Sequence, residues 1–180
     1  NYSLPANSIL CLHNDYNNNV WAGSTCNGLI SIREVSMKTY TDVVPGNDRG
    51  LSNGTVRSLY RQSPDSIWIG TDGGGINLFS PHTEKFTHYS STWGDKVAFI
   101  SGFTPGKLLI SLFSKGVFVF NPATGEKQPF TIIDKETTTR LCNRGKSVNL
   151  YQNTPNIVLF LGDHIYQYHL REEIQHHHRR

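Results

Sequence analysis

The sequence predicts an all-β protein built from repeated sheets of four short antiparallel strands. Its composition is the first reason: charged residues make up only 17% of the chain, while glycine (16 residues) and aromatic residues (11%) are frequent, a balance that favours strands over helices. The second reason is that apolar and polar residues alternate at a period of two, which is typical of strands. The third is that the same pattern returns along the chain.

The repeat is clearest between the first two units of the chain. Residues 20–24, Val-Trp-Ala-Gly-Ser, align with residues 67–71, Ile-Trp-Ile-Gly-Thr. Residues 27–30, Asn-Gly-Leu-Ile, align with residues 74–77, Gly-Gly-Ile-Asn. Both pairs of segments are offset by 47 residues. One unit therefore occupies roughly 40–50 residues, a length that is typical of repeat architectures.

The second unit shows how each repeat divides into four strands. Pro64 and Asp65 form a type I turn signal after the first strand. Gly73 and Gly74 supply the positive φ that a tight hairpin requires between the second and third strands. Pro81 closes the third strand, and the fourth is more polar. The strands are expected at residues 56–61, 66–70, 75–79 and 85–89.

Four antiparallel strands at this period are typical of the blades of a β-propeller, in which the first strand of each blade lines a central channel. Weaker copies at residues 108–118 and 157–166 bring the number of blades to about four, and the last copy lacks an obvious outer strand. The chain is therefore expected to be a partial propeller or a fragment of a larger one. The blades are expected at residues 4–43, 51–90, 96–131 and 147–170, with a polar His/Arg-rich tail at 171–180.

Two tryptophans occupy matching places in the second strand of their units. Trp21 and Trp68 are expected to pack between blades, because the second and third strands of a blade are covered on both faces. The alternative is that they stack on a sugar ring, which would require their side chains to be exposed.

Composition and charge exclude several classes of protein. The formal charge is +3, and Arg179 and Arg180 supply two of these charges, so no basic stripe indicates nucleic-acid binding. No apolar run reaches the length of a membrane-spanning helix, so no membrane contact is expected from this segment. The start of the chain carries no initiator Met and no signal-peptide pattern, and is interpreted as a cut end.

Cysteine usage gives no sign of a metal site. Cys11, Cys26 and Cys142 form no Cys-x-x-Cys motif and are odd in number, so neither a zinc site nor a disulfide framework is indicated. His176, His177 and His178 stand together in the tail, beyond the last expected strand, where a chance or end-of-chain role is the interpretation. No metal and no cofactor are expected.

Short motifs recur at fixed places in the first two units. The second unit has Leu-Ser-Asn at 51–53, the Trp-containing segment at 67–71, Gly-Gly-Ile at 74–76, and a terminal Phe86 and Tyr89. This pattern resembles the two-component regulator propeller repeat. The first unit is similar, with Leu-Pro-Ala-Asn at its start. In the third and fourth units Leu109 and Val158 stand where Trp is usual, and the resemblance extends to about Leu170.

The resemblance implies a function in signalling. Repeats of this family build the periplasmic sensor of hybrid two-component receptors, especially the carbohydrate-responsive ones of Bacteroides-type bacteria, whose parent chain is a histidine kinase. The resemblance thus implies an extracytoplasmic, periplasmic ligand-sensing segment that responds to carbohydrate, with an oligosaccharide as its ligand and no catalysis in this part of the chain. A protein–protein interaction scaffold is the alternative, and a carbohydrate-active hydrolase or lyase is a further one.

The resemblance implies a ring of seven blades, and the four units of this chain do not complete one. An open arc would leave apolar blade faces uncovered, and such faces tend to associate. The chain is therefore expected either to pair with a second copy or to belong with the remaining blades of the same receptor. A closed ring of four blades is the third alternative.

Strand parity places the candidate ligand site on one face of the propeller. Four strands per blade put the connections between blades and the turns between second and third strands on the same face. Loops on a rigid scaffold are where binding residues concentrate. The candidates on this face are Arg49, Asn53, Asp72, Trp93, Asp95, Lys115, Arg140, Arg144 and His164.

Each main candidate also has a structural interpretation. Trp93 stacks on a sugar ring or covers the apolar end of a blade. Arg140 and Arg144 clamp a carboxylate or sulfate, or are solvated loop charges. Asp72 binds a ligand or is a turn residue that hydrogen-bonds its own backbone.

Catalytic motifs are not found in the sequence. Neither Gly-x-Ser-x-Gly nor His-Glu-x-x-His is present, so no nucleophile or metal triad is indicated. Glycoside chemistry needs a pair of carboxylates, and the acidic residues on the predicted face are Asp48, Asp72, Asp95 and Asp163. These leave the hydrolase or lyase alternative open.

Overall fold

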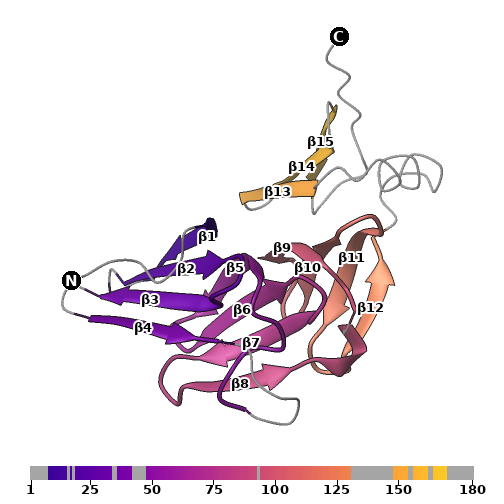
Figure 1. Cartoon of the computed structure of the whole chain (residues 1–180). Helices are drawn as coiled ribbons and strands as arrows, with labels where there is room; N and C mark the ends of the chain where they lie inside the picture. Colours follow the sequence, from indigo (N-terminus) through magenta and orange to yellow (C-terminus); the bar gives the residue numbers. More distant parts are fainter. Residues whose placement is uncertain are drawn as a thin grey trace. The chain divides into compact units, whose positions relative to one another are not determined.

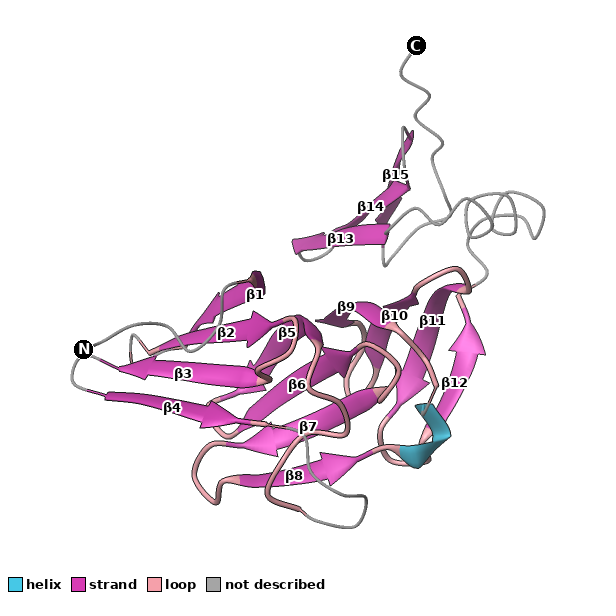
Figure 2. Cartoon of the chain, in the orientation of Figure 1, coloured by secondary structure: helices cyan, strands magenta, loops and turns pink. Residues whose placement is uncertain are grey.

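The structure, a computed structural model, is all-β, and the strands of its described residues form four antiparallel sheets (Figures 1 and 2). It describes residues 8–15, 17, 19–33, 36–41, 48–92, 94–130, 148–153, 156–161 and 164–169. The chain also divides into two compact units, which are larger than the sequence repeats. The first unit is Asn1–Ile100 and the second unit is Ser101–Arg180, and each is considered by itself.

The strands of each sheet are hydrogen-bonded in chain order. The first sheet contains β1 (Ile9–Asn14), β2 (Val20–Ser24), β3 (Leu29–Arg33) and β4 (Ser36–Tyr40). The second contains β5 (Val56–Ser63), β6 (Ser66–Thr71), β7 (Ile76–Ser80) and β8 (Lys85–His88), followed by the short 3-10 helix η1 (Ser90–Thr92). The third contains β9 (Val97–Gly102), β10 (Leu108–Leu112), β11 (Gly116–Asn121) and β12 (Glu126–Pro129). The fourth contains β13 (Val148–Asn153), β14 (Asn156–Leu161) and β15 (His164–His169).

The predicted fold class is confirmed. Four-stranded sheets that follow chain order are the blades of a propeller. In the second sheet the observed strands begin and end within two residues of the predicted bounds. Among the described residues the fourth sheet has three strands, in keeping with the expected lack of an outer strand there. No helix in the described part of the chain is long and apolar enough to cross a membrane.

An aromatic core lies between the first two sheets. Trp21 of β2 and Tyr40 of β4 meet Phe79 of β7, with ring centroids 5.5 and 4.8 Å apart. Phe79 also stacks on Phe86 of β8 at 4.5 Å. Aromatic rings bury large apolar areas and gain from edge-to-face contacts. Leu51, from the connection between the sheets, is fully buried in the same cluster.

Both tryptophans of the repeat are buried. Trp21 is 1% exposed in the core between the first two sheets, which confirms its predicted place. Trp68 is 2% exposed, and its ring centroid lies 5.5 Å from that of Tyr89. The indole N–H groups donate to repeat-equivalent partners, Asp15 at 3.2 Å and Gln62 at 2.8 Å. Because neither ring is exposed, the alternative of sugar stacking is wrong for both.

The glycine of the Trp-x-Gly segment makes room for the next blade. A Cβ on Gly23 would lie 2.6 Å from Cγ1 of Val56, the first residue of β5. A Cβ on Gly70 would lie 2.8 Å from Cγ1 of Val97, the first residue of β9. Both distances are shorter than real contacts, so only glycine allows the following strand to approach this closely. The Cys11 thiol lies beside Gly23 as well, 2.5 Å from where a Cβ would be, and its burial raises its pKa to about 11.

Candidate functional site

Connections between sheets meet the turns between second and third strands in the first unit. The Gly28 amide donates to the Gly54 carbonyl at 2.9 Å. Likewise, the Asp72 amide donates to the Thr55 carbonyl at 3.0 Å, and the Gly73 amide to the Asp95 carbonyl at 3.1 Å. These bonds place the connections and the turns on one face, which confirms the prediction from strand parity for this unit.

The connection between the first two sheets is anchored on the second sheet. The buried Asn77 side chain of β7 accepts from the Ser52 amide at 3.1 Å and donates to the Ser52 hydroxyl at 2.8 Å. That hydroxyl donates in turn to the Gly74 carbonyl at 2.8 Å. The ring of His88 hydrogen-bonds the Gly50 carbonyl at 2.8 Å. Buried amides are kept only when they are paired, so this face is a fixed platform.

Three charged side chains meet where the first strands of the second and third sheets begin. Arg57 Nη2 lies 2.6 Å from Asp72 Oδ2, and Lys96 Nζ lies 3.3 Å from Asp72 Oδ1. The backbones of Asp72 and Lys96 are paired in an isolated β-bridge. We call these three residues the Asp72 cluster. The hydrogen bond from Arg57 lowers the pKa of the Asp72 carboxyl.

The Asp72 cluster corrects one interpretation of the sequence. Asp72 was expected, as the structural alternative, to hydrogen-bond its own turn, but its carboxylate binds Arg57 and Lys96 instead. Two cations against one carboxylate leave one positive charge. The side chains of Arg57 and Lys96 are 34% and 53% exposed, so solvent and ligands reach them. Such a group can donate hydrogen bonds to a hydroxyl, carboxylate or sulfate.

The other described candidates have separate roles. Asn53 accepts a hydrogen bond from the Thr55 amide at 2.8 Å, so it shapes its own turn. Asp95 is 1% exposed, which buries its side chain beneath the face where it was expected. Arg49 is exposed and lines a hollow away from the Asp72 cluster. Lys115 is exposed on the turn between β10 and β11 and belongs to the second unit.

The side chains of the remaining four candidates are not described. Trp93, Arg140 and Arg144 lie outside the described residues. His164 is the first residue of β15, and its side chain is not described. Within the described ranges, no group of three His, Cys, Asp or Glu side chains is placed to hold a metal ion.

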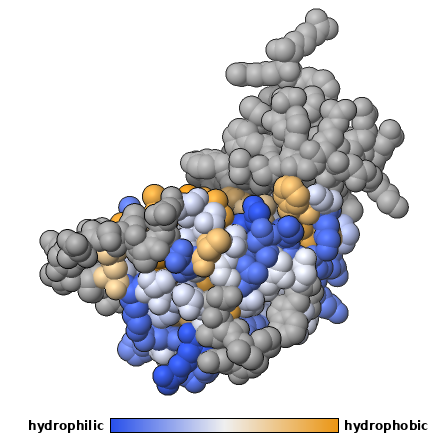
Figure 3. Space-filling model, viewed as in Figure 1, coloured by the Kyte–Doolittle hydropathy of each residue, from blue (hydrophilic) through white to orange (hydrophobic). Residues whose placement is uncertain are grey.

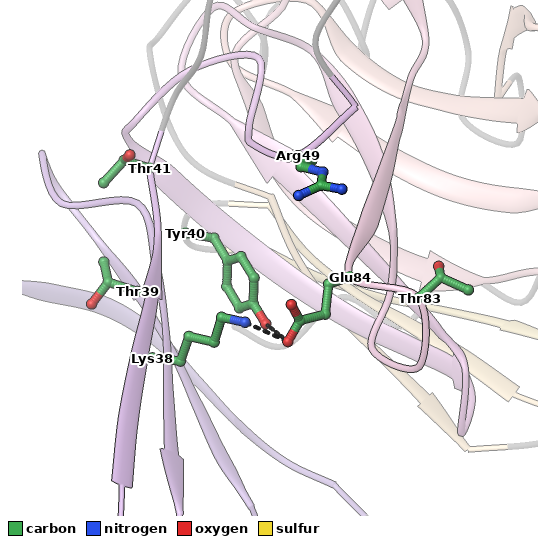
Figure 4. Close-up of a pocket in the computed structure, with 7 residues that line it drawn as sticks. All are labelled: Lys38, Thr39, Tyr40, Thr41, Arg49, Thr83 and Glu84. Atoms are coloured by element: carbon green, nitrogen blue, oxygen red, sulfur yellow. Dashed lines mark hydrogen bonds and ion pairs between the residues drawn. The ribbon is translucent and has the colours of Figure 1, made fainter.

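A polar hollow of about 340 Å³ lies between the outer strand of the first sheet and the second sheet (Figure 4). We call it the β4 hollow. Lys38, Tyr40 and Glu84 point toward one another in Figure 4, and the Arg49 side chain enters from the other side. Lys38 Nζ lies 2.5 Å and the Tyr40 hydroxyl 3.3 Å from Glu84 Oε1. The residues that line it are Lys38, Thr39, Tyr40, Thr41, Arg49, Thr83 and Glu84.

Glu84 holds a backbone conformation that favours glycine. Its φ is +57°, and its amide donates to the Ser80 carbonyl at 2.8 Å. The matching turn of the third sheet has Gly125 at this position, with φ +72° and a 2.8 Å bond to the Asn121 carbonyl. For a residue with a Cβ this conformation costs about 1–2 kcal/mol. The chain therefore carries a strained glutamate where its own repeat uses glycine.

The ion pair of Glu84 does not repay this strain by itself. The side chains of Lys38 and Glu84 are 53% and 47% exposed, and exposed ion pairs contribute about 0–1 kcal/mol because water and salt screen them. The hollow was not predicted from the sequence, because its residues belong to three separate segments. The one available signal was Glu84 at the place where the third repeat has Gly125.

Two segments of the chain match the family model of the two-component regulator propeller, at residues 3–25 and 50–73. Each segment spans the start of a repeat and includes Trp21 or Trp68. These two segments therefore match the two-component regulator propeller repeat, which confirms the resemblance for the first two repeats of the chain. No protein of curated function matches the sequence.

The fold is similar to that of solved bacterial propellers. The extracellular domain of BT3049 from B. thetaiotaomicron, described as a hybrid two component system, has a TM-score of 0.76 and 18% identity over 95% of this chain and 23% of that chain. The corresponding domain of BT4673 has a TM-score of 0.67 and 20% identity, over 93% and 24%. Virginiamycin B lyase from Staphylococcus aureus has a TM-score of 0.69 and 16% identity, over 97% and 57%. These likenesses show the β-propeller fold, and the chain spans less than a quarter of the two B. thetaiotaomicron domains.

Proposed function

We propose that this chain is a ligand-sensing segment of the extracytoplasmic, periplasmic part of a two-component receptor, that it responds to carbohydrate, and that it has no catalytic activity of its own. One observation carries the proposal: the two matched segments supply the first two strands of the first two sheets, and the connections of these sheets form the anchored face that holds the Asp72 cluster. The similar B. thetaiotaomicron structures are described as extracellular domains, which supports the proposed location.

The Asp72 cluster is suited to a ligand with many hydroxyl groups. Arg57 and Lys96 donate hydrogen bonds, and the Asp72 carboxylate accepts them.

Binding to the native protein tests the proposal directly. Neutral and acidic oligosaccharides are titrated into the full chain by calorimetry, and the sugars are recovered and analysed for cleavage. One oligosaccharide is expected to bind, to raise Tm by mass action, and to be recovered intact. Arg57→Gln and Lys96→Gln are expected to weaken its binding at least tenfold, whereas Lys107→Gln, on an exposed turn of the second unit, is the matched control.

Three outcomes would contradict the proposal. Cleaved sugar would favour the hydrolase or lyase alternative, which the likeness of the fold to virginiamycin B lyase keeps in view. Binding of a protein partner with no response to any sugar would favour the scaffold. Sugar binding that ignores Arg57→Gln and Lys96→Gln would remove the Asp72 cluster from the site.

A further inference from the structure

We propose that the ligand of the Asp72 cluster is a sugar unit that carries an anionic group, a carboxylate or a sulfate, and that its ring lies over two glycines beside the cluster, Gly73 and Gly94. We call these two residues the glycine shelf. The inference rests on the proposed function and deepens it, because it names the class of sugar and the surface on which the ring lies.

The glycine shelf is built from two segments that are hydrogen-bonded side by side. The Gly94 amide donates to the Gly73 carbonyl at 2.8 Å, and the Gly73 amide donates to the Asp95 carbonyl at 3.1 Å. The next pair along the two segments is the β-bridge between Asp72 and Lys96. The shelf therefore adjoins the charged side chains, and since consecutive Cα atoms are about 3.8 Å apart, one sugar unit can reach both.

Both glycines of the shelf leave open space where another residue would place a side chain. Apart from neighbours in the chain, no described atom lies within 4 Å of a Cβ built on Gly73 or Gly94, and Gly94 is exposed. Other glycines of the same unit are crowded, because a Cβ would press against neighbouring atoms at Gly23, Gly28, Gly70, Gly74 and Gly75. Packing requires those glycines and leaves the shelf bare.

A left-handed backbone does not by itself require glycine in the turn that holds Gly73. Gly73 has a φ of +97°, and such values favour glycine. In the matching turn of the third sheet, however, Ser114 holds a φ of +61° with its side chain in place. This position of the repeat thus tolerates a side chain, and a bare backbone there allows a ligand to approach closely.

The atoms that face solvent at the Asp72 cluster indicate the anionic group. The side chains of Arg57 and Lys96 are 34% and 53% exposed, whereas that of Asp72 is 20% exposed and its Oδ1 is buried. A ligand therefore meets chiefly N–H donors and positive charge, which suit the oxygens of a carboxylate or sulfate. Asp95, next to Lys96 in the chain, is 1% exposed and lies out of reach of a ligand.

The probes for the test separate the acidic group from the sugar ring. They are methyl β-D-glucuronide, methyl β-D-glucoside 6-sulfate, methyl β-D-glucoside, acetate and inorganic sulfate, each titrated into the full chain at low salt and followed by NMR. At least one of the two acidic sugars is expected to bind tenfold more tightly than the glucoside and the two simple anions, and the tighter of the two identifies the group. Lys96→Gln is expected to abolish the preference for the acidic sugar over the glucoside.

Variants of the glycine shelf test where the ring lies. Gly73→Asn and Gly94→Asn place a side chain in the open space, and asparagine tolerates positive φ better than most residues. Each is expected to weaken binding of the acidic sugar at least tenfold. The matched control is Gly106→Asn in the second unit, since Gly106 has a φ of +76° and equally open surroundings. It is expected to change Tm as much as the shelf variants do and to leave binding unchanged.

Several outcomes would overturn the proposal. They are an acidic sugar that binds no more tightly than the glucoside, a simple anion that binds as tightly as the acidic sugars, and folded shelf variants that bind as the unchanged protein does. A neutral oligosaccharide that binds in place of the acidic sugars, and depends on Arg57 and Lys96, would overturn this inference and keep the proposed function. Failure of every sugar to bind would overturn both.

Discussion

At the scale of single residues, glycine controls how closely successive blades pack. Gly23 and Gly70 stand 47 positions apart, and each lies against the valine that begins the next first strand. The positions differ from the turn glycines Gly28 and Gly75, which have φ of +72° and +74°. The first pair is required by close approach and the second also by backbone conformation.

Gly70→Ala is expected to lower the free energy of unfolding by about 1–3 kcal/mol, because the new methyl group would overlap Val97 and force the neighbouring strand to shift. Urea unfolding followed by tryptophan fluorescence measures the change. Ala123→Ser adds one heavy atom at an exposed turn position and is expected to stay within about 0.5 kcal/mol. Equal stabilities of the Gly70→Ala variant and the unchanged protein would show that the close approach is not real.

At the scale of elements, one buried amide secures a whole connection. Asn77→Ala removes both hydrogen bonds to Ser52 and leaves the Ser52 amide without its partner. The variant is expected to lose about 1–3 kcal/mol and to speed hydrogen exchange at the Ser52 amide. Exchange measured by NMR at Ile69, inside β6, serves as the internal reference. Unchanged protection of the Ser52 amide would show that Asn77 does not hold the connection in place.

The Asp72 cluster links two strand starts through charge, so its contribution depends on pH. The folded-state pKa of Asp72 is lowered by Arg57, so the stabilisation is fully present above the unfolded pKa of about 3.9 and is lost as pH falls through the lower folded value. Asp72→Asn is expected to cost about 1 kcal/mol at neutral pH.

The measurement compares urea unfolding of the variant and the unchanged protein at pH 7 and near pH 3. The difference between the two proteins is expected to shrink at the acid pH, where the carboxylate begins to take up its proton. Other aspartates titrate in both proteins and cancel in the comparison. A difference that is the same at both pH values would mean that the loss comes from packing and not from the ion pairs.

The elements could be predicted from the sequence because their signals are local. Glycine pairs, prolines and period-two alternation marked the strands of the second sheet, and Trp21 and Trp68 marked the covered positions. The site was predicted less well, because its contacts are not local. Arg57 and Lys96 lie 39 residues apart and meet only through Asp72. The β4 hollow joins β4, Arg49 and the turn between β7 and β8, and no periodicity within one segment indicates that.

At the scale of the whole molecule, polar residues cover much of the described surface on the face seen in Figure 3, and the large apolar side chains that are exposed among the described residues are Leu10, Leu12 and Phe113. Leu10 and Leu12 are 44% and 66% exposed on β1. Residues next to one another on a strand face opposite sides, so these leucines point away from the side of the first sheet that covers the second. Propeller blades are normally covered on both sides.

Because this side of the first sheet is uncovered, we expect copies of the chain to associate through it. Light scattering over a dilution series is expected to give a mass that rises above the 20.3 kDa of one chain as concentration increases. Leu12→Asp is expected to shift the rise to higher concentration, since a buried charge opposes association, and Thr87→Asp on the exposed part of β8 is the matched control. A mass of one chain at every concentration would contradict the prediction.

The contact between Gly23 and Val56, together with the bond from the Gly28 amide to the Gly54 carbonyl, has a consequence for synthesis. The first sheet ends at Tyr40. Its second strand nevertheless packs against Val56, and its hairpin is hydrogen-bonded to Gly54, and both residues belong to the following repeat. When Tyr40 has just emerged from the ribosome, the first blade would therefore still be uncovered on that side. The first sheet can therefore complete its packing only after the start of the second repeat has been synthesised.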